Sequence, residues 1–404
     1  MLDFKGFMKI PTLTDGTISL KCTAKHPADP QKGWVPSYDF DIYLDNSHIL
    51  GIPDEKVGDC RLRIGTHAQL RYPGHIGYAI DAGHRGNGYA AKACRLLRPV
   101  ALYHGLNELI ISVYEDNSPS WRVCEKLCAR FVKTTEIPQW HDLYAEGAQY
   151  MHIFNWNIEK HSKPIMPEDK LYKGKARDIY STNLDDIIIL KNRDDLTSGN
   201  GAKRGSFEGK GAINNCISSA IFRYLMQKGI NTHYIGQYTI NSITAVSLDM
   251  LPLEVVVRNV AYGSFASGYG IKEGKVLNEP LIEYFYKNDK YNDPMLAHAH
   301  IMAMELATPE QIEIIDNLAK KINYLLIDVF DSLGIMLIDF KMEFGIDSNG
   351  FILLADEISP DTCRLWDKAT KKPMDKDIFR KNMGGIKEAY QEVLRRMEDG
   401  GYIY

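Results

Sequence analysis

The sequence lacks the features of a membrane, secreted or nucleic-acid-binding protein. None of its apolar runs approaches the roughly 20 residues that a membrane-spanning helix needs. Its start, MLDFKGFMKI, lacks the basic-then-apolar pattern of a signal peptide. The 48 Lys and Arg residues against 52 Asp and Glu give a net charge of −4, which leaves no excess of positive charge to follow a phosphate backbone. We therefore expect a cytoplasmic protein with no membrane or nucleic-acid partner.

Cysteine is also scarce in this chain. The seven cysteines are odd in number and form no C-x-x-C pair, which argues against a disulfide framework and against a cysteine zinc site. Internal repeats and low-complexity tracts are lacking as well, which excludes a solenoid. At a usual domain size of roughly 100–200 residues, the 404 residues predict two or three domains.

A loss of periodicity indicates where the domains meet. From Trp156 to Asp169 the sequence WNIEKHSKPIMPED has no periodic pattern, contains two prolines and mixes charges of both signs, which is typical of a connection between domains. We therefore predict an N-terminal domain of residues 1–155, a linker of residues 156–169 and a C-terminal domain of residues 170–404.

The N-terminal part has the sequence order of a phosphate site, which is strand, glycine-rich turn and helix. A strand is predicted over residues 75–81, the turn contains Gly86 and Gly88, and the run AAKACRLLRPVALYHG then has apolar residues at helical spacing. Glycines let the backbone approach an anion, and the free N–H groups at the helix start face it. A lone Gly-x-Gly is equally typical of a tight turn that caps a helix, so the motif alone leaves both interpretations open.

The residues downstream favour the phosphate site. A second strand is predicted over residues 108–114, and Asn-Ser-Pro-Ser at residues 117–120 opens a helix with the sequence WRVCEKLCARF. Residues 77–131 resemble the GCN5-related N-acetyltransferase (GNAT) family, in which an R-G-x-G-x-A turn holds the pyrophosphate of acetyl-coenzyme A. The resemblance implies an α+β fold with a mixed central sheet flanked by helices. The acetyl-coenzyme A ligands that it implies are Arg85, Gly86, Asn87, Gly88, Tyr89, Ala90 and Asn117.

Two positions depart from the GNAT pattern. Cys124 stands where members often have a tyrosine that acts as general acid toward the leaving thiolate. A thiol with a pKa near ~8.5 could donate a proton, but we favour a small core residue on an apolar helix face. Cys128 stands where the family usually has glycine. The domain is thus expected to be an acetyltransferase of unknown acceptor or, alternatively, a non-catalytic coenzyme A binder that acts as a sensor or docking module.

The C-terminal part opens with a predicted hairpin. Residues 170–180, KLYKGKARDIY, combine alternating character with one glycine and several basic residues. Such a hairpin can fold over a polyphosphate, because its basic side chains neutralise the phosphates and the glycine permits close approach. A charged edge strand would have the same pattern.

A second predicted strand carries charged residues on one face. In residues 337–345, LIDFKMEFG, strict alternation places the apolar residues on a buried face and Asp339, Lys341 and Glu343 together on the other. A merely solvated face would alternate in the same way. The strand that follows, FILLADE at residues 351–357, argues against that interpretation because it carries further carboxylates after a hairpin signal.

The hairpin signal predicts a metal site. Asn349-Gly350 is the strongest short hairpin dipeptide, and a two-residue loop there would place Glu343 directly opposite Asp356. Two facing carboxylates repel unless a cation lies between them. Because oxygen ligands beside a nucleotide select a hard ion, the predicted cation is Mg²⁺.

Five sequence blocks of the C-terminal part occur in order. They are LYKGKARDIY at 171–180, KGAINNCIS at 210–218, LDMLPLEVVVRNVAYGS at 248–264, LIDFKMEFG at 337–345 and ADEISPDTCRLWD at 355–367. Together they closely resemble the SAICAR synthetase family (phosphoribosylaminoimidazole-succinocarboxamide synthase) of purine biosynthesis over residues 170–404. The resemblance implies a two-lobed α+β fold, with a small lobe of residues 170–250, a large lobe of residues 251–404 and the ATP site between them.

The SAICAR synthetase family joins the carboxylate of the aminoimidazole ribotide CAIR to the amino group of L-aspartate. The reaction uses ATP and passes through an acyl phosphate. A kinase-like phosphotransferase with another acceptor remains the alternative, and it would release ADP without any need for aspartate. The family also implies an oligomer, such as a dimer.

The resemblance also implies roles for individual residues. The residues assigned to ATP are Gly174, Lys175, Arg177, Lys287, Met250 and Leu251, with residues 250–253 as an adenine-binding hinge between the lobes. Those assigned to Mg²⁺ are Glu343 and Asp356. Those assigned to the phosphate of CAIR are Arg258, Ser264 and Arg364, and Lys341 and Asp361 are assigned to its carboxylate and ring amine. The expected catalytic residues are Lys341, Asp339, Asp361 and Glu343, where Asp339 would orient Lys341 or bind the metal through water.

Two positions depart from the SAICAR synthetase pattern. Tyr262 stands where a small residue usually precedes Gly263-Ser264, so the phosphate loop is expected to pack differently. Asn200 stands where an aspartate is common, which removes one negative charge beside the nucleotide.

Overall fold

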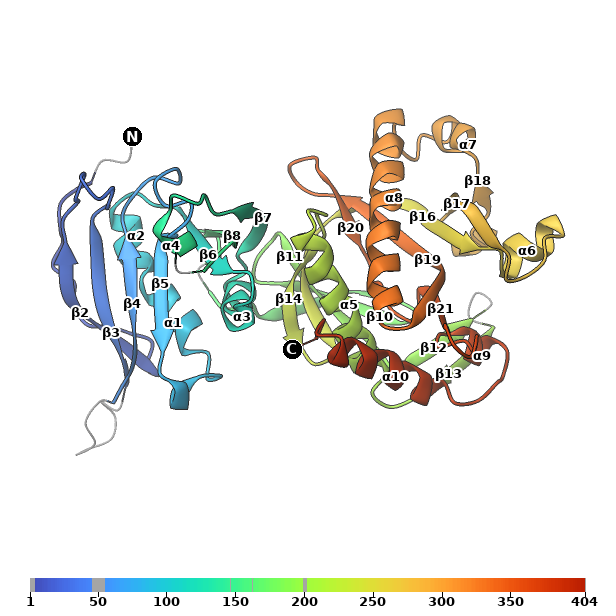
Figure 1. Cartoon of the computed structure of the whole chain (residues 1–404), viewed down its shortest axis with the longest axis horizontal. Helices are drawn as coiled ribbons and strands as arrows, with labels where there is room; N and C mark the ends of the chain where they lie inside the picture. The colour runs from blue at the N-terminus through green and yellow to red at the C-terminus, as the bar shows by residue number, and fades with distance from the viewer. Residues whose placement is uncertain (1–3, 46–54, 146, 162, 199–201, 404) are drawn as a thin grey trace. The chain divides into compact units, whose positions relative to one another are not determined.

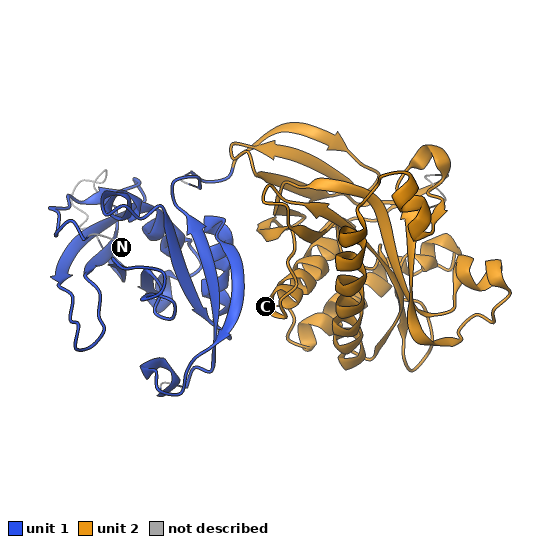
Figure 2. Cartoon of the chain, turned by 90° about the horizontal axis from the view of Figure 1, so that it is seen from above, with its two compact units in different colours: residues 1–165 blue, residues 166–404 orange. Residues whose placement is uncertain are grey.

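The chain divides into two compact units, residues 1–165 and residues 166–404 (Figure 2). The computed structural model describes residues 4–45, 55–145, 147–161, 163–198 and 202–403. The division falls within the predicted linker, but the irregular segment is shorter than predicted. Strand β8 (Tyr150–Asn157) takes in its first residues because Trp156 is fully buried, and strand β9 (Pro167–Lys173) begins before its end. A proline is tolerated there because it is the first residue of its strand.

The strands of the first unit form two antiparallel sheets (Figure 1). The larger sheet has the order β1 (Leu13–Thr14), β2 (Ile18–His26), β3 (Ser37–Leu44), β4 (Lys56–Arg63), β5 (Ile76–Ile80). The smaller sheet has the order β6 (Glu108–Tyr114), β8, β7 (Arg130–Glu136). Within the described residues β5 and β6 share no ladder, so the central sheet is divided between these two strands.

His75 fixes the point at which β5 and β6 part. Its backbone N–H donates to the carbonyl of Ile110 at 2.8 Å, and the N–H of Ile110 donates to Nδ1 of the His75 ring at 2.9 Å. Nε2 of the ring lies 3.2 Å from the carbonyl of Gly65, to which it donates in this tautomer. The ring is fully buried, and burial lowers the pKa of His75 to about 4.

The helices of the first unit are short. They are η1 (Ala82–His84), α1 (Tyr89–Leu96), α2 (Arg98–Tyr103), α3 (Ser118–Leu127) and α4 (Asp142–Ala145). Helix α1 packs against β2 and β5, while α3 packs against α1, β6 and β8. Along the chain α1 follows β5 and α3 follows β6, which are the two strands between which the central sheet divides.

The second unit begins with an antiparallel sheet and a long helix. The sheet has the order β14 (Tyr234–Thr239), β15 (Ser242–Val246), β11 (Ile187–Asn192), β10 (Arg177–Thr182), β9. Helix α5 (Lys210–Gln227) packs against β11, β14 and β15. The strands β12 (Asp195–Ser198) and β13 (Lys203–Ser206) form a separate hairpin. The predicted hairpin over residues 170–180 is confirmed as β9 and β10.

A second antiparallel sheet follows in the same unit. Its strands are β18 (Met295–Leu296), β17 (Val276–Tyr286), β16 (Asp249–Val260), β19 (Ile335–Ile346) and β20 (Ile352–Ala355), with β21 (Cys363–Asp367) also paired to β19. Helix α8 (Pro309–Ser332) packs against this sheet (Figure 1). The other helices are α6 (Gly263–Tyr269), η2 (Asp289–Tyr291), α7 (His298–Ala303), α9 (Asp377–Arg380) and α10 (Ile386–Asp399). Among the described helices, none has the length and apolar content to cross a membrane.

Strand β19 has the alternation that its sequence predicts. Its apolar face is fully buried, with Ile338, Phe340 and Met342 each 0% exposed. Its polar face carries Asp339, Lys341 and Glu343, which line a cleft. The polar residues are therefore not a solvated surface.

The register of the β19–β20 hairpin differs from the predicted one. Glu343 faces Ala355, so the prediction that it lies directly opposite Asp356 is wrong. The loop has three residues because the carboxylate of Asp347 accepts hydrogen bonds from the N–H groups of Asn349 and Phe351, at 2.9 and 3.0 Å. This side-chain turn competes with the two-residue turn that Asn-Gly favours.

The buried neutral ring of His75 makes the first unit sensitive to acid. The unfolded histidine takes up a proton near pH 6.5 and the folded one only near pH 4. The unfolded state therefore binds more protons in this window, and stability falls as the pH drops from 6.5 to about 4, by up to about 3 kcal/mol. We expect hydrogen-exchange protection of residues 76–80 and 108–114, corrected for intrinsic rates, to fall from pH 7 to pH 5. In His75→Asn, which keeps an acceptor for Ile110, the decrease should be smaller, and an equal decrease would contradict this explanation.

Candidate active site

A cleft of about 740 Å³ lies between the two sheets of the second unit. The first sheet contributes the apolar side chains of Leu171, Ile179, Leu190 and Val246. The second sheet and its loops contribute most of the charged side chains, which are Glu254, Arg258, Lys287, Asp339, Lys341, Glu343, Asp356, Glu357, Asp361 and Arg364. One wall can thus pack against a flat apolar group while the other binds charged groups.

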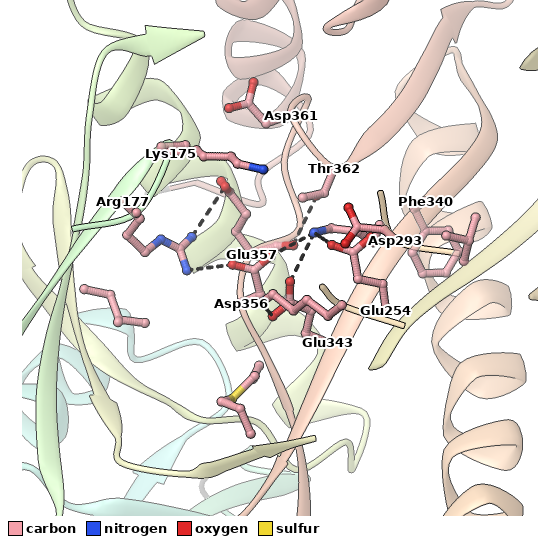
Figure 3. Close-up of a pocket in the computed structure, with 18 of the residues that line it drawn as sticks. Lys175, Arg177, Glu254, Asp293, Phe340, Glu343, Asp356, Glu357, Asp361 and Thr362 are labelled. Carbon is pink, nitrogen blue, oxygen red and sulfur yellow. Dashed lines mark hydrogen bonds and ion pairs between the residues drawn. The ribbon is translucent and has the colours of Figure 1, made fainter. Parts of the chain in front are cut away.

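Lys341 lies among the carboxylates of the charged wall, of which Glu254, Glu343 and Asp356 are labelled in Figure 3. Its Nζ contacts Oε1 of Glu254 at 2.8 Å, Oε1 of Glu343 at 3.1 Å and Oδ2 of Asp356 at 3.9 Å. Burial alone would lower the pKa of Lys341, but the three carboxylates outweigh burial and raise it above its usual value. Lys341 is therefore held as a cation among carboxylates that would otherwise repel one another.

Asp356 reaches this cluster by an unusual backbone conformation. It follows the last residue of β20 with φ of +61°, in the left-handed region that non-glycine residues rarely adopt. Its Oδ1 accepts a hydrogen bond from Nη1 of Arg177 at 3.1 Å. The carboxyl groups of Glu343 and Asp356 thus both contact Lys341, although the ladder does not place them opposite each other.

Two arginines share one carboxylate in the same cleft. Oδ2 of Asp339 accepts from Nη1 of Arg258 at 2.8 Å and from Nη1 of Arg364 at 2.7 Å. Nε of Arg258 also donates to Glu283 at 2.7 Å, so this buried cation is paired twice. Asp339 thus lies between two arginines, and its expected role toward Lys341 or a metal-bound water stays a prediction. Ser264 lines the cleft beside them, at the start of α6.

Asp361 is held by residues that the sequence did not single out. The Nζ atom of Lys210 lies 2.5 Å from its Oδ2, and the hydroxyl of Tyr390 donates to its Oδ1 at 2.7 Å. Burial alone would raise the pKa of Asp361, but Lys210 and Lys376 outweigh burial and lower it. Asp361 is therefore ionised and fixed in orientation.

The residues expected to bind ATP lie partly in the cleft. Gly174 is required locally because a Cβ there would lie 2.7 Å from the carbonyl of Arg177. Lys175 contacts Asp289 at 2.6 Å, and Lys287 contacts Glu343. Both lysines line the cleft.

The predicted hinge over residues 250–253 is part of a strand. It lies in β16, with a bulge between Met250 and Glu254 where the ladder to β19 shifts. Met250 is 41% exposed and lines the cleft, whereas the side chain of Leu251 is buried. Asn200 lies outside the described residues.

The glycine-rich turn of the first unit has the conformation of an anion cradle. Gly86 and Gly88 have φ of +85° and +78°, and α1 begins at the next residue, so its first N–H groups lack intrahelical acceptors. Arg85 donates from Nε to the carbonyl of Ile80 at 3.0 Å, and Asn87 donates to the carbonyl of His84. The backbone of the turn, rather than its side chains, is thus available to a phosphate.

The second motif of the first unit surrounds the start of α3. Oδ1 of Asn117 accepts from the N–H of Ser120 at 3.1 Å and caps the helix. Cys124 is 0% exposed, and burial raises its pKa well above the usual value, which confirms it as a core residue. Cys128 has φ of +57° at the helix end, a conformation that glycine adopts more easily.

Comparison with known proteins places the second unit in a family. Residues 170–397, more than half of the chain, match the model described as SAICAR synthetase. The chain belongs to the SAICAR synthetase family. It is 47% identical over 229 residues to phosphoribosylaminoimidazole-succinocarboxamide synthase of Staphylococcus aureus (strain JH9), which covers 57% of this chain and 98% of that protein. The expected ATP-dependent ligase of purine biosynthesis is thus supported for this unit.

Solved SAICAR synthetase structures share the fold of this unit. The enzyme from Ehrlichia chaffeensis is 40% identical with a TM-score of 0.56, covering 57% of this chain and 98% of that one. A type-2 SAICAR synthetase in complex with ADP is 45% identical with a TM-score of 0.55, covering 56% of this chain and 96% of that one. In the first unit, residues 23–130 match the model of an acetyltransferase (GNAT) domain. The predicted α+β fold and the two resemblances are confirmed.

Several residues of the SAICAR synthetase cleft went unpredicted. Glu254, Glu357 and Lys376 line the cleft, while Lys210 and Tyr390 contact Asp361 without lining it. Glu254 could have been found, since it is a lone charge within the apolar run LPLEVVV. Lys210 gave no such signal, because a lysine at a helix start is ordinarily solvated and only the packing of α5 buries it.

Removing the central cation of this SAICAR synthetase cleft should cost stability in a pH-dependent way. In Lys341→Met the carboxylates of Glu254, Glu343 and Asp356 lose their shared cation, which is one of the groups that lower the folded pKa of Asp356. The folded variant then binds more protons than the folded unaltered chain, and the stability deficit grows as the pH rises through the range in which carboxylates ionise. We expect a deficit of about 1–3 kcal/mol at pH 7.5 and a smaller one at pH 5, measured by denaturant unfolding. The exposed Lys320→Met on α8 is the control, and a deficit independent of pH would contradict the prediction.

Proposed function

We propose that residues 166–404 join CAIR and L-aspartate with ATP, giving SAICAR, ADP and phosphate. The observation that supports this best is the separation of cations along one cleft. Arg177 and Lys175 belong to the glycine hairpin, Lys341 lies among carboxylates, and Arg258 and Arg364 share Asp339. These three groups suit the nucleotide phosphates, the reacting carboxylate and the phosphate of the ribotide.

In the proposed reaction the substrate carboxylate must first be activated, because a carboxylate is a poor acyl donor. An oxygen of the CAIR carboxylate attacks the γ-phosphorus of ATP, and ADP leaves with the electrons of the broken P–O bond. The amino group of aspartate then attacks the acyl carbon, the C–O bond to phosphate breaks, and the amine loses a proton. Lys341 neutralises the reacting carboxylate and holds it in line, which is mainly a matter of positioning and electrostatics.

The residues of the cleft fit a magnesium ion. Glu343 and Asp356 present hard oxygen donors on either side of one cation site. In the described part of the chain no group of three or more His, Cys, Asp or Glu is gathered for a metal, so phosphate oxygens and water would complete the shell. When bound, Mg²⁺ would neutralise negative charge on the phosphates. Lys287 contacts Glu343 and would have to yield this carboxylate to the ion.

The substitution Glu343→Gln tests the ligase and the metal site together. It keeps the shape of a side chain that is 3% exposed and removes its charge, so the fold should persist. We expect Mg²⁺-dependent formation of SAICAR to fall by roughly 100-fold or more, since metal stabilisation is worth several kcal/mol. The exposed Glu313→Gln on α8 should behave as the unaltered chain, and a near-normal rate in Glu343→Gln would remove this residue from the metal site.

The same assay separates the ligase from a phosphotransferase. The ligase releases ADP over many turnovers only when CAIR and aspartate are both present. ADP release that requires no aspartate would favour a phosphotransferase acting on another acceptor.

We propose that the first unit binds acetyl-coenzyme A and transfers its acetyl group to an amine. The turn of Gly86 and Gly88 supports the binding step, and the match to the GNAT model supports the transfer. Because the side chain of Cys124 is 0% exposed, we assign it to the core and not to the role of general acid, and a non-catalytic coenzyme A sensor is the alternative. Consumption of acetyl-coenzyme A with a panel of amines distinguishes the two, since tight binding without turnover would favour the sensor.

Gly88→Ala tests the proposed coenzyme A site. A side chain at φ of +78° is strained, so the substitution should distort the turn from which α1 begins. Gly33→Ala is a matched control, because Gly33 has φ of +67°, has open space around it and lies elsewhere in the same unit. We expect Gly88→Ala to weaken acetyl-coenzyme A binding by roughly 10-fold, measured by titration calorimetry, and Gly33→Ala to leave it unchanged. Equal affinities for both variants would contradict the assignment.

A further inference from the structure

Tyr262 departs from the family pattern and occupies a specific place in the fold. It lies at the N-terminal cap position of α6, two residues after the end of β16, and is 6% exposed. Its ring packs with Val260 and Ile338, and the edge of Trp366 meets it at a centroid distance of 5.2 Å. The ring is therefore fixed from the side of the core.

Two cations contact the remaining surface of this ring. Cζ of Arg364 lies 5.4 Å from the ring centroid of Tyr262, and Nζ of Lys381 lies 4.6 Å from it. Nζ of Lys381 also donates a hydrogen bond to the Tyr262 hydroxyl. Both distances are within the roughly 6 Å at which a cation is attracted to an aromatic face. A small residue in place of Tyr262 would offer neither cation a partner.

Arg364 is constrained by several different contacts. Its Nη1 donates to Asp339, and its Nε lies 3.3 Å from Oδ2 of Asp377. The backbone of Gly263 also approaches closely, since a Cβ there would lie 3.2 Å from Nη2 of Arg364. The two carboxylates contact nitrogen atoms at the edge of the guanidinium, and the ring of Tyr262 adds a contact to its central carbon.

We propose that Tyr262 and Lys381 are positioning residues that set how tightly this chain binds the phosphate of its ribotide substrate. Tyr262 contacts the guanidinium of Arg364, and Lys381 holds the hydroxyl of Tyr262. Lys381 does not line the cleft, so it acts through the tyrosine. This inference rests on the proposed ligase function, in which Arg364 binds the substrate phosphate.

The test compares substrates as well as variants. In the full chain, Tyr262→Ala should raise the KM for CAIR by about 2- to 30-fold, the factor that corresponds to a cation–π contact of roughly 0.5–2 kcal/mol. The kcat and the KM values for ATP and aspartate should change less than about twofold. Tyr262→Leu keeps the apolar volume without the π face and should behave in the same way, which covers the possibility that Tyr262→Ala folds poorly.

Rescue by the conservative variant separates positioning from simple core packing. Tyr262→Phe keeps the ring over Arg364 and should retain most of the CAIR affinity. Because Lys381 acts through the hydroxyl, Lys381→Met and Tyr262→Phe should raise the KM for CAIR slightly and should not add in the double variant. The controls are Tyr284→Phe, which loses a buried hydroxyl bond to Asp316 elsewhere, and the exposed Lys320→Met.

The outcomes distinguish this inference from the proposed function. An unchanged KM for CAIR in Tyr262→Leu, or an equal rise in KM for all three substrates, would overturn the positioning role. Calorimetry of CAIR binding to the unaltered chain and to Tyr262→Leu compares their affinities directly, without turnover. Failure of the unaltered chain to form SAICAR would therefore refute the ligase, whereas equal CAIR affinities in the unaltered chain and Tyr262→Leu would refute the inference.

Discussion

The ammonium of Lys341 is the interaction on which the second unit depends. Alternation along β19 gathers charged side chains on one face, and that face would destabilise the sheet if its carboxylates had no cation between them. The ammonium of Lys341 offsets the repulsion between the carboxylates of this face. The carboxylate of Asp339 likewise offsets the repulsion between the guanidinium groups of Arg258 and Arg364. Each buried charge in the cleft thus has an opposite charge in contact, so the site is balanced before any substrate binds.

The sequence predicted the elements of this site better than their connections. Alternation located the polar face of β19, and the spacing of the β6 residues predicted that strand with its observed bounds, because both signals are local. The register of the β19–β20 hairpin was missed because the carboxylate of Asp347 forms a turn of its own. The burial of Lys210 depends on Asp361, more than a hundred residues later, and no local pattern reports such a contact.

The first unit shows the same division between local and distant signals. The glycine turn and the cap at Asn117 were recognisable from spacing, and the apolar face of α3 indicated that Cys124 is a core residue. The separation of β5 from β6 was not predicted, because it occurs beside the buried ring of His75, whose Nδ1 accepts from the N–H of Ile110 in place of a backbone carbonyl. No local pattern in the sequence indicates that the ring of His75 accepts a hydrogen bond from the neighbouring strand.

The left-handed backbone at Asp356 limits how this position can change during evolution. Glycine and asparagine adopt such a conformation readily, but neither carries a charge, while glutamate carries the charge but adopts the conformation poorly. Every single replacement therefore loses either the local geometry or the carboxylate. A change that kept a carboxylate in contact with Arg177 and Lys341 would therefore have to move the hairpin and the residue together.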